Sequence, residues 1–375
     1  KIKGDIALNV TQLEFDGFRN LETGLIRPDP GVNIFYGNNA QGKTNLLESI
    51  WLFTGGRSFR GSKDLDTVGF DKERARLKLE FFAFERLQHA EILIQRKRSA
   101  SLGGVQLPSP AGLAGNFCAV VFCPSHLSLI EDGPEERRRF IDAAYCQLRP
   151  GYIKILANFQ RCLAQRNALL KNFKKAMGFT GADLSALEVW DERLAAAGAQ
   201  VFLARSSYIR RLIPAAREIY KGISGGSESF SIRYLSNAGD ENTTQEQAYK
   251  NLMEVFKVKQ HEDLAAGFTT VGPHRDDLEI LISGKSARIY GSQGQKRSAV
   301  IALKLAEASL LRDVTGEQPV ALLDDVMSEL DSVRQDYILN HIKGWQVFVT
   351  CCDPGPVLRL AGGKVFKIEQ GRITQ

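Results

Sequence analysis

A glycine-rich stretch near the N-terminus has the residue types and spacing of a phosphate-binding loop. It matches the pattern G-x-x-x-x-G-K-[ST] in full. Glycines let the backbone turn tightly around phosphate oxygens, and successive N–H groups at a helix start supply partial positive charge. The lysine would reach the β- and γ-phosphates of a nucleoside triphosphate, and the threonine hydroxyl would bind Mg²⁺. The predicted nucleotide-binding residues are Gly37, Asn38, Asn39, Ala40, Gln41, Gly42, Lys43 and Thr44.

Two carboxylates follow an apolar run far along the chain. Residues 320–323 read Val-Ala-Leu-Leu, which is typical of a buried strand, and Asp324 and Asp325 come directly after it. A phosphate loop needs a carboxylate for its metal, so Asp324 is the expected Mg²⁺ ligand beside Thr44, and Asp325 could polarise an attacking water. We predict Lys43, Asp324 and Asp325 as catalytic residues. The alternative is that either acid only caps the following helix.

A second glycine motif, Tyr-Gly-Ser-Gln-Gly-Gln-Lys-Arg at 290–297, precedes an apolar helical run that extends to Leu311. Ser and Gly at a helix N-terminus make another anion site. A further polar segment, Ser-Glu-Leu-Asp at 328–331, follows the two acids. Lys43 and Asp324 are far apart in the sequence, so a large segment must lie between the two halves of the nucleotide site.

The elements that would position these motifs can be read from the hydrophobic pattern. Apolar residues alternate, as in strands, over 8–15, 75–83 and 89–96, whereas 32–36 and 346–350 are short apolar runs. Helical spacing appears over 44–53 and over two longer stretches, 152–177 and 187–212, with Pro214 as a kink or an end. Residues 222–245 are rich in Gly, Ser, Asn and Thr, which indicates a linker or an exposed hairpin.

Composition restricts the class of protein. The chain has 375 residues, 43% of them hydrophobic and 25% charged, with a formal net charge of +6. These fractions exclude a disordered or fibrous chain, and no apolar run approaches the ~20 residues that span a bilayer. Six scattered cysteines indicate reduced thiols, and the first residues lack a signal-peptide core, so we expect a cytoplasmic protein that makes no membrane contact.

Basic residues cluster in two places that could contact nucleic-acid phosphate. Residues 143–182 contain seven Lys or Arg and no acid, and the loop after the first helix is also basic. Such clusters suit salt-sensitive binding without base-specific readout. The alternative is an ordinary solvated helix face. The predicted DNA-binding residues are Arg57, Arg60, Lys154 and Arg161.

Taken together, these motifs resemble the RecF family of SMC-like repair ATPases, within the ABC-type ATPases. The resemblance extends over almost the whole chain. The phosphate loop is generic, whereas Val-Gly-Pro-His-Arg-Asp-Asp at 271–277 combined with Ser-Gln-Gly-Gln at 292–295 is specific. Further matching stretches are 16–21, 57–60, 137–142, 165–167 and 322–331.

The resemblance implies a fold and a domain organisation. The fold class would be α/β, an ABC-type P-loop ATPase head with an inserted, short coiled-coil-like helical domain. The head would comprise residues 1–133 and 265–375 (lobe I), and the mainly helical insertion residues 134–264 (lobe II).

The resemblance also implies a mechanism in which two subunits enclose ATP. Ser292, Gly294 and Gln295 would reach the γ-phosphate bound by a second copy of the chain, and Arg19 and Asn20 would touch the nucleotide. The ATP-dependent homodimer would bind DNA, preferably duplex next to single-strand gaps. It would act with recombination mediator proteins of the RecO/RecR type, and slow, DNA-stimulated hydrolysis would release it.

The sequence departs from ABC patterns in three places. Thr350-Cys351-Cys352 stands where transporter ATPases carry a switch histidine, Asp325 stands where many relatives carry Glu, and Ser125-His126 replaces a more acidic pair. The first two departures favour slow hydrolysis. Two alternatives remain open: the ATPase subunit of a membrane transporter, and a nucleotide-dependent scaffold with negligible turnover.

Overall fold

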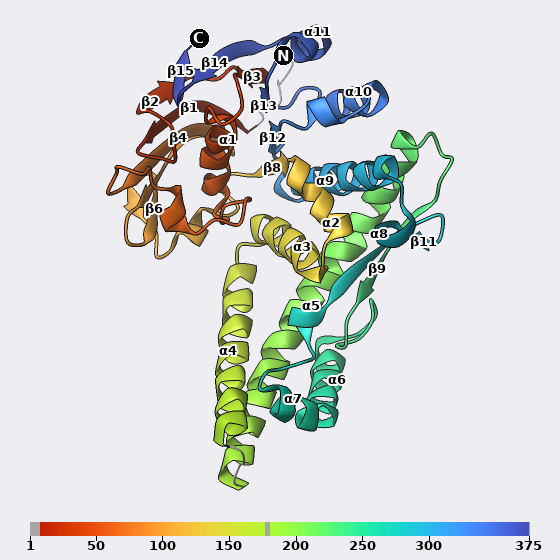
Figure 1. Ribbon diagram of the computed structural model, residues 1–375. Coiled ribbons are helices and arrows are strands. Elements are labelled where there is room, and N and C mark those ends of the chain that lie inside the picture. The colour runs from red at the N-terminus through yellow and green to blue at the C-terminus, as the bar shows by residue number, and fades with distance from the viewer. Residues whose placement is uncertain (1–7, 177–180, 375) are drawn as a thin grey trace. The chain divides into compact units, whose positions relative to one another are not determined.

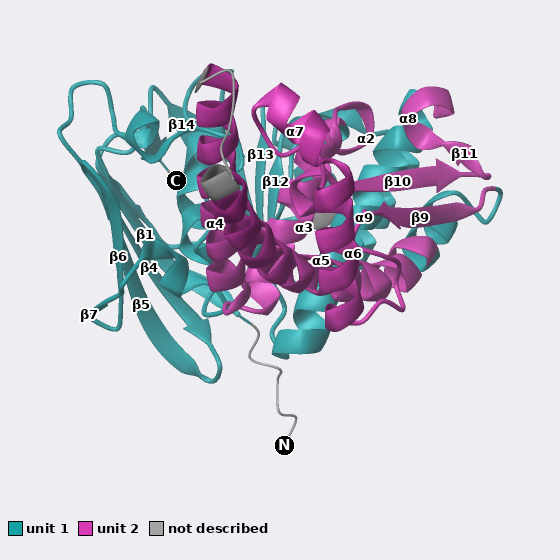
Figure 2. Cartoon of the chain, turned by 90° about the horizontal axis from the view of Figure 1, so that it is seen from below, with its two compact units in different colours: residues 1–127, 218–227, 293–375 teal, residues 128–217, 228–292 magenta. Residues whose placement is uncertain are grey.

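The computed structural model describes residues 8–176 and 181–374 (Figure 1). Contacts within the chain divide it into two compact units, coloured separately in Figure 2. Unit 1 comprises residues 1–127, 218–227 and 293–375, and unit 2 comprises residues 128–217 and 228–292. In the described part of the chain, no helix is both long and apolar enough to cross a membrane.

A mostly parallel sheet forms one layer of unit 1. Its strand order is β15-β14-β3-β13-β12-β8, and only the β14–β15 pair is antiparallel. The central strands are continuous apolar runs because a parallel sheet is covered on both faces. The carboxyl ends of β3, β12 and β13 therefore meet at one edge. The strands are β3 (Val32–Tyr36), β8 (Ala119–Phe122), β12 (Val320–Asp324), β13 (Val347–Cys351), β14 (Lys364–Glu369) and β15 (Arg372–Thr374).

An antiparallel sheet of order β2-β1-β4-β5-β6-β7 forms a second layer of the same unit. Its long strands alternate buried and exposed side chains, as the sequence predicted for the segments around 8–15, 75–83 and 89–96. A single buried core contains residues of both sheets and of the intervening helix, among them Phe15, Leu46 and Phe348. The strands are β1 (Asn9–Asp16), β2 (Gly24–Ile26), β4 (Ala75–Ala83), β5 (Arg86–Ile94), β6 (Arg98–Leu102) and β7 (Val105–Gln106).

The helices of unit 1 follow the strands that end at the polar motifs. Helix α1 begins at Lys43, within the predicted phosphate loop, and ends at Trp51. Helix α9 (Gln293–Thr315) follows the second glycine motif and is buried over most of its length. The others are α10 (Ser332–His341), α11 (Gly355–Ala361) and the short 3-10 helices η1 (Leu52–Thr54), η2 (Asp64–Thr67), η3 (Pro110–Leu113), η4 (Pro124–Leu127) and η6 (Met327–Glu329).

Unit 2 is mainly helical and contains the small antiparallel sheet β11-β10-β9. Two long helices, α4 (Tyr152–Ala176) and α5 (Gly181–Ile223), correspond to the two stretches of helical spacing, and the end of α5 from residue 218 belongs to unit 1. The position 177 at the end of the first stretch lies outside the described residues. The remaining elements are α2 (Ser128–Glu131), α3 (Pro134–Leu148), β9 (Phe230–Leu235), α6 (Gln245–Val258), α7 (Gln260–Ala266), η5 (Pro273–Arg275), β10 (Asp277–Ile282), β11 (Lys285–Ser286) and α8 (Ala287–Tyr290).

Three local expectations meet a different structure. Of the two outcomes expected at Pro214, a kink or a helix end, the end is excluded, because α5 continues through this residue to Ile223. The segment 222–245 is not only a linker, because β9 lies within it and pairs along its whole length with β10. For the same reason residues 265–292 belong to unit 2 by their contacts, whereas the sequence placed them in the head. The strand pairing between β9 and β10 is long-range, and no local pattern signals it.

A buried arginine joins the helices of unit 2. Arg166 on α4 is fully buried, and its guanidinium donates to Asp191 on α5 and to Asp263 on α7, at 2.5 and 2.6 Å. It also donates to the Thr269 hydroxyl at 2.9 Å and lies over the ring of Phe256. Buried charges are tolerated only when they are paired in this way, so this cluster specifies how the helices of unit 2 pack.

Candidate nucleotide site

The predicted phosphate loop, residues 37–44, follows the end of β3 and includes the first two residues of α1. Gly42 takes the left-handed region (φ 110°), where a Cβ would come within 2.9 Å of the Asn20 Oδ1 atom. A Cβ on Gly37 would come within 2.2 Å of the Ile368 carbonyl oxygen. Glycine is therefore required at both positions. The ammonium of Lys43 donates to the carbonyls of Gly37 and Asn38, so the loop curls around the lysine that is expected to hold phosphate.

Neighbouring segments hold this loop from outside. The Asn20 side-chain amide donates to the Ala40 carbonyl at 3.1 Å. The backbone of Gln41 accepts from the Gly371 N–H at 2.9 Å, in the turn between β14 and β15. The exposed Cys352 thiol lies 3.5 Å from the Lys43 ammonium and 3.3 Å from the Asn39 side-chain oxygen. The loop is thus in contact with segments from both ends of the chain.

The acid that ends β12 lies against the threonine of the phosphate loop. The Thr44 hydroxyl donates to Asp324 Oδ1 at 2.8 Å. A second hydroxyl, that of the fully buried Thr350 at the end of β13, donates to the same oxygen at 2.8 Å. Thr350 Oγ1 also accepts the backbone N–H of Asp325 at 3.0 Å. One side chain therefore positions both acids. Sequence reasoning noted only that position 350 lacked a histidine.

Burial raises the pKa of the Asp324 carboxyl, and the hydrogen bonds from Thr44 and Thr350 lower it, as does the positive charge of Arg60. A carboxylate held in this way at the edge of a parallel sheet is poised to gain a cation. Among the described residues, no group of three or more His, Cys, Asp or Glu side chains could hold a metal without help. The adjacent oxygens of Thr44 and Asp324 suit Mg²⁺, which binds few protein groups and takes its other oxygens from phosphate and water.

Asp325 has an uncommon backbone conformation. Its φ of 52° places it in the left-handed region, which Asp tolerates better than most residues with a Cβ. The Ser328 hydroxyl donates to its carbonyl at 2.8 Å and lies 3.2 Å from Asp325 Oδ1. The side chain is half-buried, so it can reach both the site and solvent. This geometry is compatible with the predicted role of Asp325 toward an attacking water.

The structure places Arg19 and Asn20 differently from each other. Asn20 is exposed and holds the phosphate loop, and the Asn45 amide donates to its Oδ1 at 2.7 Å. Arg19 is instead paired with the fully buried Glu48, to which it donates at 2.9 and 3.0 Å. Contact of Arg19 with a nucleotide would require this ion pair to open. Contact by Asn20 requires no such change.

The second glycine motif lies at the start of α9. Ser292 is exposed immediately before the helix. Arg334, on α10, donates to the Gly294 carbonyl at 3.0 Å and to the Ser298 hydroxyl at 2.9 Å, and it pairs with Asp331. The start of α9 is therefore joined to the segment 328–331. Arg334 carries this connection, and its type and position gave no signal in the sequence.

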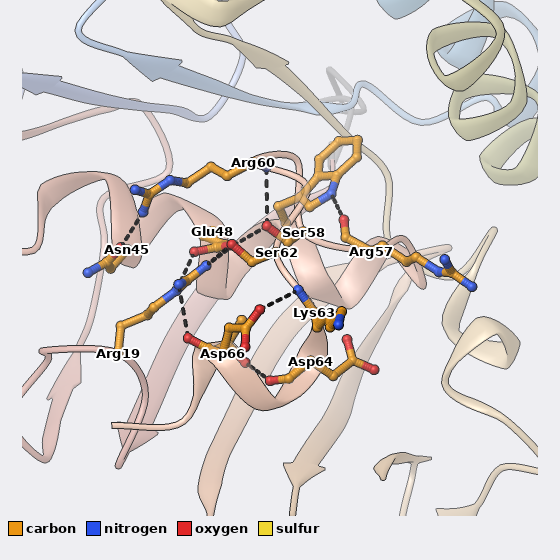
Figure 3. Close-up of polar contacts among 12 residues, drawn as sticks. Arg19, Asn45, Glu48, Arg57, Ser58, Arg60, Ser62, Lys63, Asp64 and Asp66 are labelled. Atoms are coloured by element: carbon orange, nitrogen blue, oxygen red, sulfur yellow. Dashed lines mark hydrogen bonds and ion pairs between the residues drawn. The ribbon is translucent and has the colours of Figure 1, made fainter. Parts of the chain in front are cut away.

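The predicted DNA-binding residues lie in two separate parts of the chain. Arg57 and Arg60 are exposed on the loop after η1 in unit 1, and both are drawn in Figure 3. Lys154 and Arg161 are exposed on α4 in unit 2. Arg60 donates to the Asn45 side chain at 2.9 Å, so it lies beside the first helix of the nucleotide site. The contact of these four residues with DNA stays a prediction.

The fold and the motifs define the class as an ABC-type ATPase head of the SMC kind. Residues 12–179 match a family model described as an AAA domain. SMC head domains from Pyrococcus furiosus and Pyrococcus yayanosii superpose with TM-scores of 0.53 and 0.55 over 98% of this chain and at least 95% of theirs. Their identities of 17% and 13% support a shared fold only.

Closer relatives define the family. The chain is 38% identical over 97% of its length to the DNA replication and repair protein RecF of Alkaliphilus oremlandii, covering 99% of that protein. It is 36% identical over 92% of its length to RecF of Acetivibrio thermocellus, covering 93% of that protein. A solved structure of the recombination mediator protein RecF with ATP, in the RecFOR pathway, superposes with a TM-score of 0.91 at 36% identity, over 100% of this chain and 99% of that one. This chain belongs to the RecF family.

Proposed function

We propose that this protein is an ATP-dependent DNA-binding clamp that acts as a recombination mediator in DNA repair and replication. One observation carries the proposal. Thr44 and Asp324 are 280 positions apart in the sequence, yet the Thr44 hydroxyl donates a 2.8 Å hydrogen bond to Asp324 beside a complete phosphate-loop motif. Membership of the RecF family, and the ATP complex of a RecF protein with the same fold, support ATP as the nucleotide.

The residues of the site would divide the work of binding. On nucleotide binding, the Lys43 ammonium would exchange the carbonyls of Gly37 and Asn38 for phosphate oxygens. Backbone N–H groups of the loop would supply further donors. Thr44 and Asp324 would hold Mg²⁺, which would neutralise charge on the β- and γ-phosphates.

Hydrolysis would break the bond between the γ-phosphorus and the oxygen bridging to ADP, with water as the nucleophile. Asp325 would orient that water and accept its proton. The side chain of Asp325 is shorter than that of the Glu many relatives carry. Thr350 stands in the segment where transporter ATPases carry a switch histidine, so this chain lacks that second polar group beside the γ-phosphate. We therefore infer slow, DNA-stimulated hydrolysis, suited to limiting the lifetime of a complex. A scaffold with negligible turnover is the alternative, and single-turnover hydrolysis with and without DNA separates the two.

Assembly would depend on a second copy of the chain. Ser292, Gly294 and Gln295 at the start of α9 would bind the γ-phosphate held by the partner, because a helix N-terminus with adjacent polar groups attracts anions. ATP would thereby add charge-assisted hydrogen bonds across the interface, and hydrolysis would remove them. The dimer would bind DNA, preferably duplex beside a single-strand gap, through Arg57, Arg60, Lys154 and Arg161. It would act in the cytoplasm together with recombination mediator proteins of the RecO/RecR type.

The test measures the molar mass of the protein by light scattering with ATP, with ADP and without nucleotide. We expect a dimer only with ATP. Lys43→Ala should bind no ATP and stay monomeric, and Ser292→Arg should bind ATP as a monomer. Ser227→Arg, in an exposed turn of unit 1, is the control and should dimerise normally. Normal dimerisation of Ser292→Arg would refute the shared site. Membrane association without DNA stimulation would instead favour a transporter subunit, which the family membership disfavours.

A further inference from the structure

A buried carboxylate lies one helical turn beyond the phosphate-binding threonine. Glu48 is on α1, four residues after Thr44, and is 0% exposed. Neighbouring residues of the helix, such as Leu47 and Trp51, are buried and apolar. A charge in such a place is costly unless every oxygen has a partner, so its partners indicate why it is there.

The partners of Glu48 come from two segments outside the helix. The Arg19 guanidinium, after β1, donates to both carboxylate oxygens, and the Ser58 hydroxyl donates to Oε1 (Figure 3). Arg19 also donates to the Ser62 hydroxyl at 2.8 Å and to the Asp66 carbonyl at 3.0 Å. One ion pair therefore anchors both ends of the loop that follows η1.

This loop, residues 57–63, presents its basic side chains to solvent, while Ser58 and Ser62 are held by hydrogen bonds. Arg57, Arg60 and Lys63 are exposed, whereas Ser58 between them is buried. The Ser58 oxygen that donates to Glu48 also accepts the N–H of Arg60 at 3.1 Å. Ser58 therefore links the Glu48 carboxylate to the backbone of Arg60.

A second, exposed connection runs from the same loop to the phosphate loop. Arg60 donates to the Asn45 oxygen at 2.9 Å, Asn45 donates to Asn20 at 2.7 Å, and Asn20 donates to the Ala40 carbonyl at 3.1 Å. Nucleotide phosphate would lie among Ala40, Lys43 and Thr44, so it would meet one end of this chain of hydrogen bonds. Arg60 lies at the other end.

We propose that Glu48 is a positioning residue that fixes the basic loop 57–63 to the phosphate-binding helix and so couples nucleotide binding to the binding of nucleic-acid phosphate by that loop. The inference rests on the proposed function, because it assumes that both ligands bind. Helix α1 contacts nucleotide at its first turn and holds the loop at its second turn. A shift of α1 is therefore transmitted to the loop, and by linkage DNA changes the affinity for nucleotide by the same factor.

The experiment measures the affinity for a fluorescent gapped DNA with and without a non-hydrolysable ATP analogue, and takes the ratio of the two dissociation constants. Variants are Glu48→Gln, which keeps the shape but not the charge, and Ser58→Ala, which removes only the link from Glu48 to the loop. Matched controls are Glu80→Gln and Ser99→Ala, in the antiparallel sheet of the same unit.

We expect the wild-type ratio to exceed about fivefold, which is the low end of typical coupling, and to approach one in both variants. The affinity for the ATP analogue alone should change by less than about twofold in Ser58→Ala, since that variant leaves α1 intact. The controls should keep the wild-type ratio. Should Glu48→Gln fail to fold, Ser58→Ala still decides the question.

Wild-type ratios in Ser58→Ala and in folded Glu48→Gln would overturn this inference while leaving the proposed function in place, as would a wild-type protein that binds both ligands without any coupling. A wild-type protein that binds neither ATP analogue nor DNA would overturn the proposed function itself.

Discussion

The hydroxyl of Thr350 provides the sharpest test of how the nucleotide site works. It donates to Asp324 and accepts from the N–H of Asp325, at 2.8 and 3.0 Å, and is completely buried. Thr350→Val keeps the shape of the side chain and removes both hydrogen bonds. A hydrogen bond to a charged group contributes roughly 1.5–3 kcal/mol, and an unpaired N–H costs about 1 kcal/mol or more.

We therefore expect Thr350→Val to lose about 2–3 kcal/mol of positioning energy at the two acids. If that loss falls on the transition state, single-turnover ATP hydrolysis slows by roughly 30–160-fold, since about 1.4 kcal/mol is a factor of ten. Thr350→Ser should restore most of the rate. Thr11→Val removes a comparable hydroxyl-to-carboxylate bond in the antiparallel sheet and should leave hydrolysis unchanged.

The pH profile gives an independent readout. The Thr350 hydrogen bond lowers the pKa of Asp324, against the burial that raises it. Without Thr350 this pKa rises further, and Asp324 must be ionised to hold Mg²⁺, so the acid limb of the activity profile should move to higher pH. A folded Thr350→Val protein that hydrolyses ATP within about twofold of the wild-type rate, with an unshifted acid limb, would refute the reasoning.

Four further outcomes are expected. Burial raises the pKa of Asp324, so its anion is unfavourable in the ligand-free fold. Asp324→Asn should therefore raise the free energy of unfolding at pH 7 by about 0.5–2 kcal/mol, measured by thermal unfolding, while abolishing Mg²⁺-dependent hydrolysis; a lower Tm would contradict this. Cys352 is exposed beside Asn39 and Lys43, so ATP should slow its alkylation by maleimide, measured by mass spectrometry, and equal rates with and without ATP would count against the loop geometry. Arg166→Met should lower the free energy of unfolding by about 3–5 kcal/mol in denaturant, because two buried aspartates lose their partner. The control Arg161→Met, on the exposed side of the same helix, should change that free energy by less than about 0.5 kcal/mol, and similar losses in both variants would contradict the role of the cluster. Burial lowers the pKa of His274 to about 4, so the unfolded chain takes up a proton before the folded chain does as the pH falls below 6.5. The free energy of unfolding, measured against pH, should therefore fall toward pH 4 by up to about 3 kcal/mol more than that of His274→Gln; parallel curves for the two proteins would exclude this cause.

Several elements followed directly from local pattern. The run 32–36 is β3 as predicted, and the strands around 320–323 and 346–350 are β12 and β13. The helical spacing over 44–53 covers most of α1 and the first residues of η1. These segments have strong hydrophobic patterns and are bounded by glycine or acidic residues. Other local conformations would therefore bury less of their apolar surface. The sequence did not show whether α5 would continue through Pro214. A proline removes one helical hydrogen bond, and the helix continues only when the packing of its other residues offsets that loss, which is a tertiary property.

Local sequence pattern predicts the phosphate loop, because Gly37, Gly42, Lys43 and Thr44 act through backbone freedom and side-chain type, and both are local properties. It also predicts the roles of the two acids, and the resemblance to the RecF family is confirmed by the relatives. The distant groups that complete the candidate site are brought together by the long-range packing of the chain. Thr350 and Glu48 are ordinary residues in the sequence and acquire their roles because parallel strands end at one edge and because a buried charge must find partners, wherever in the chain they lie.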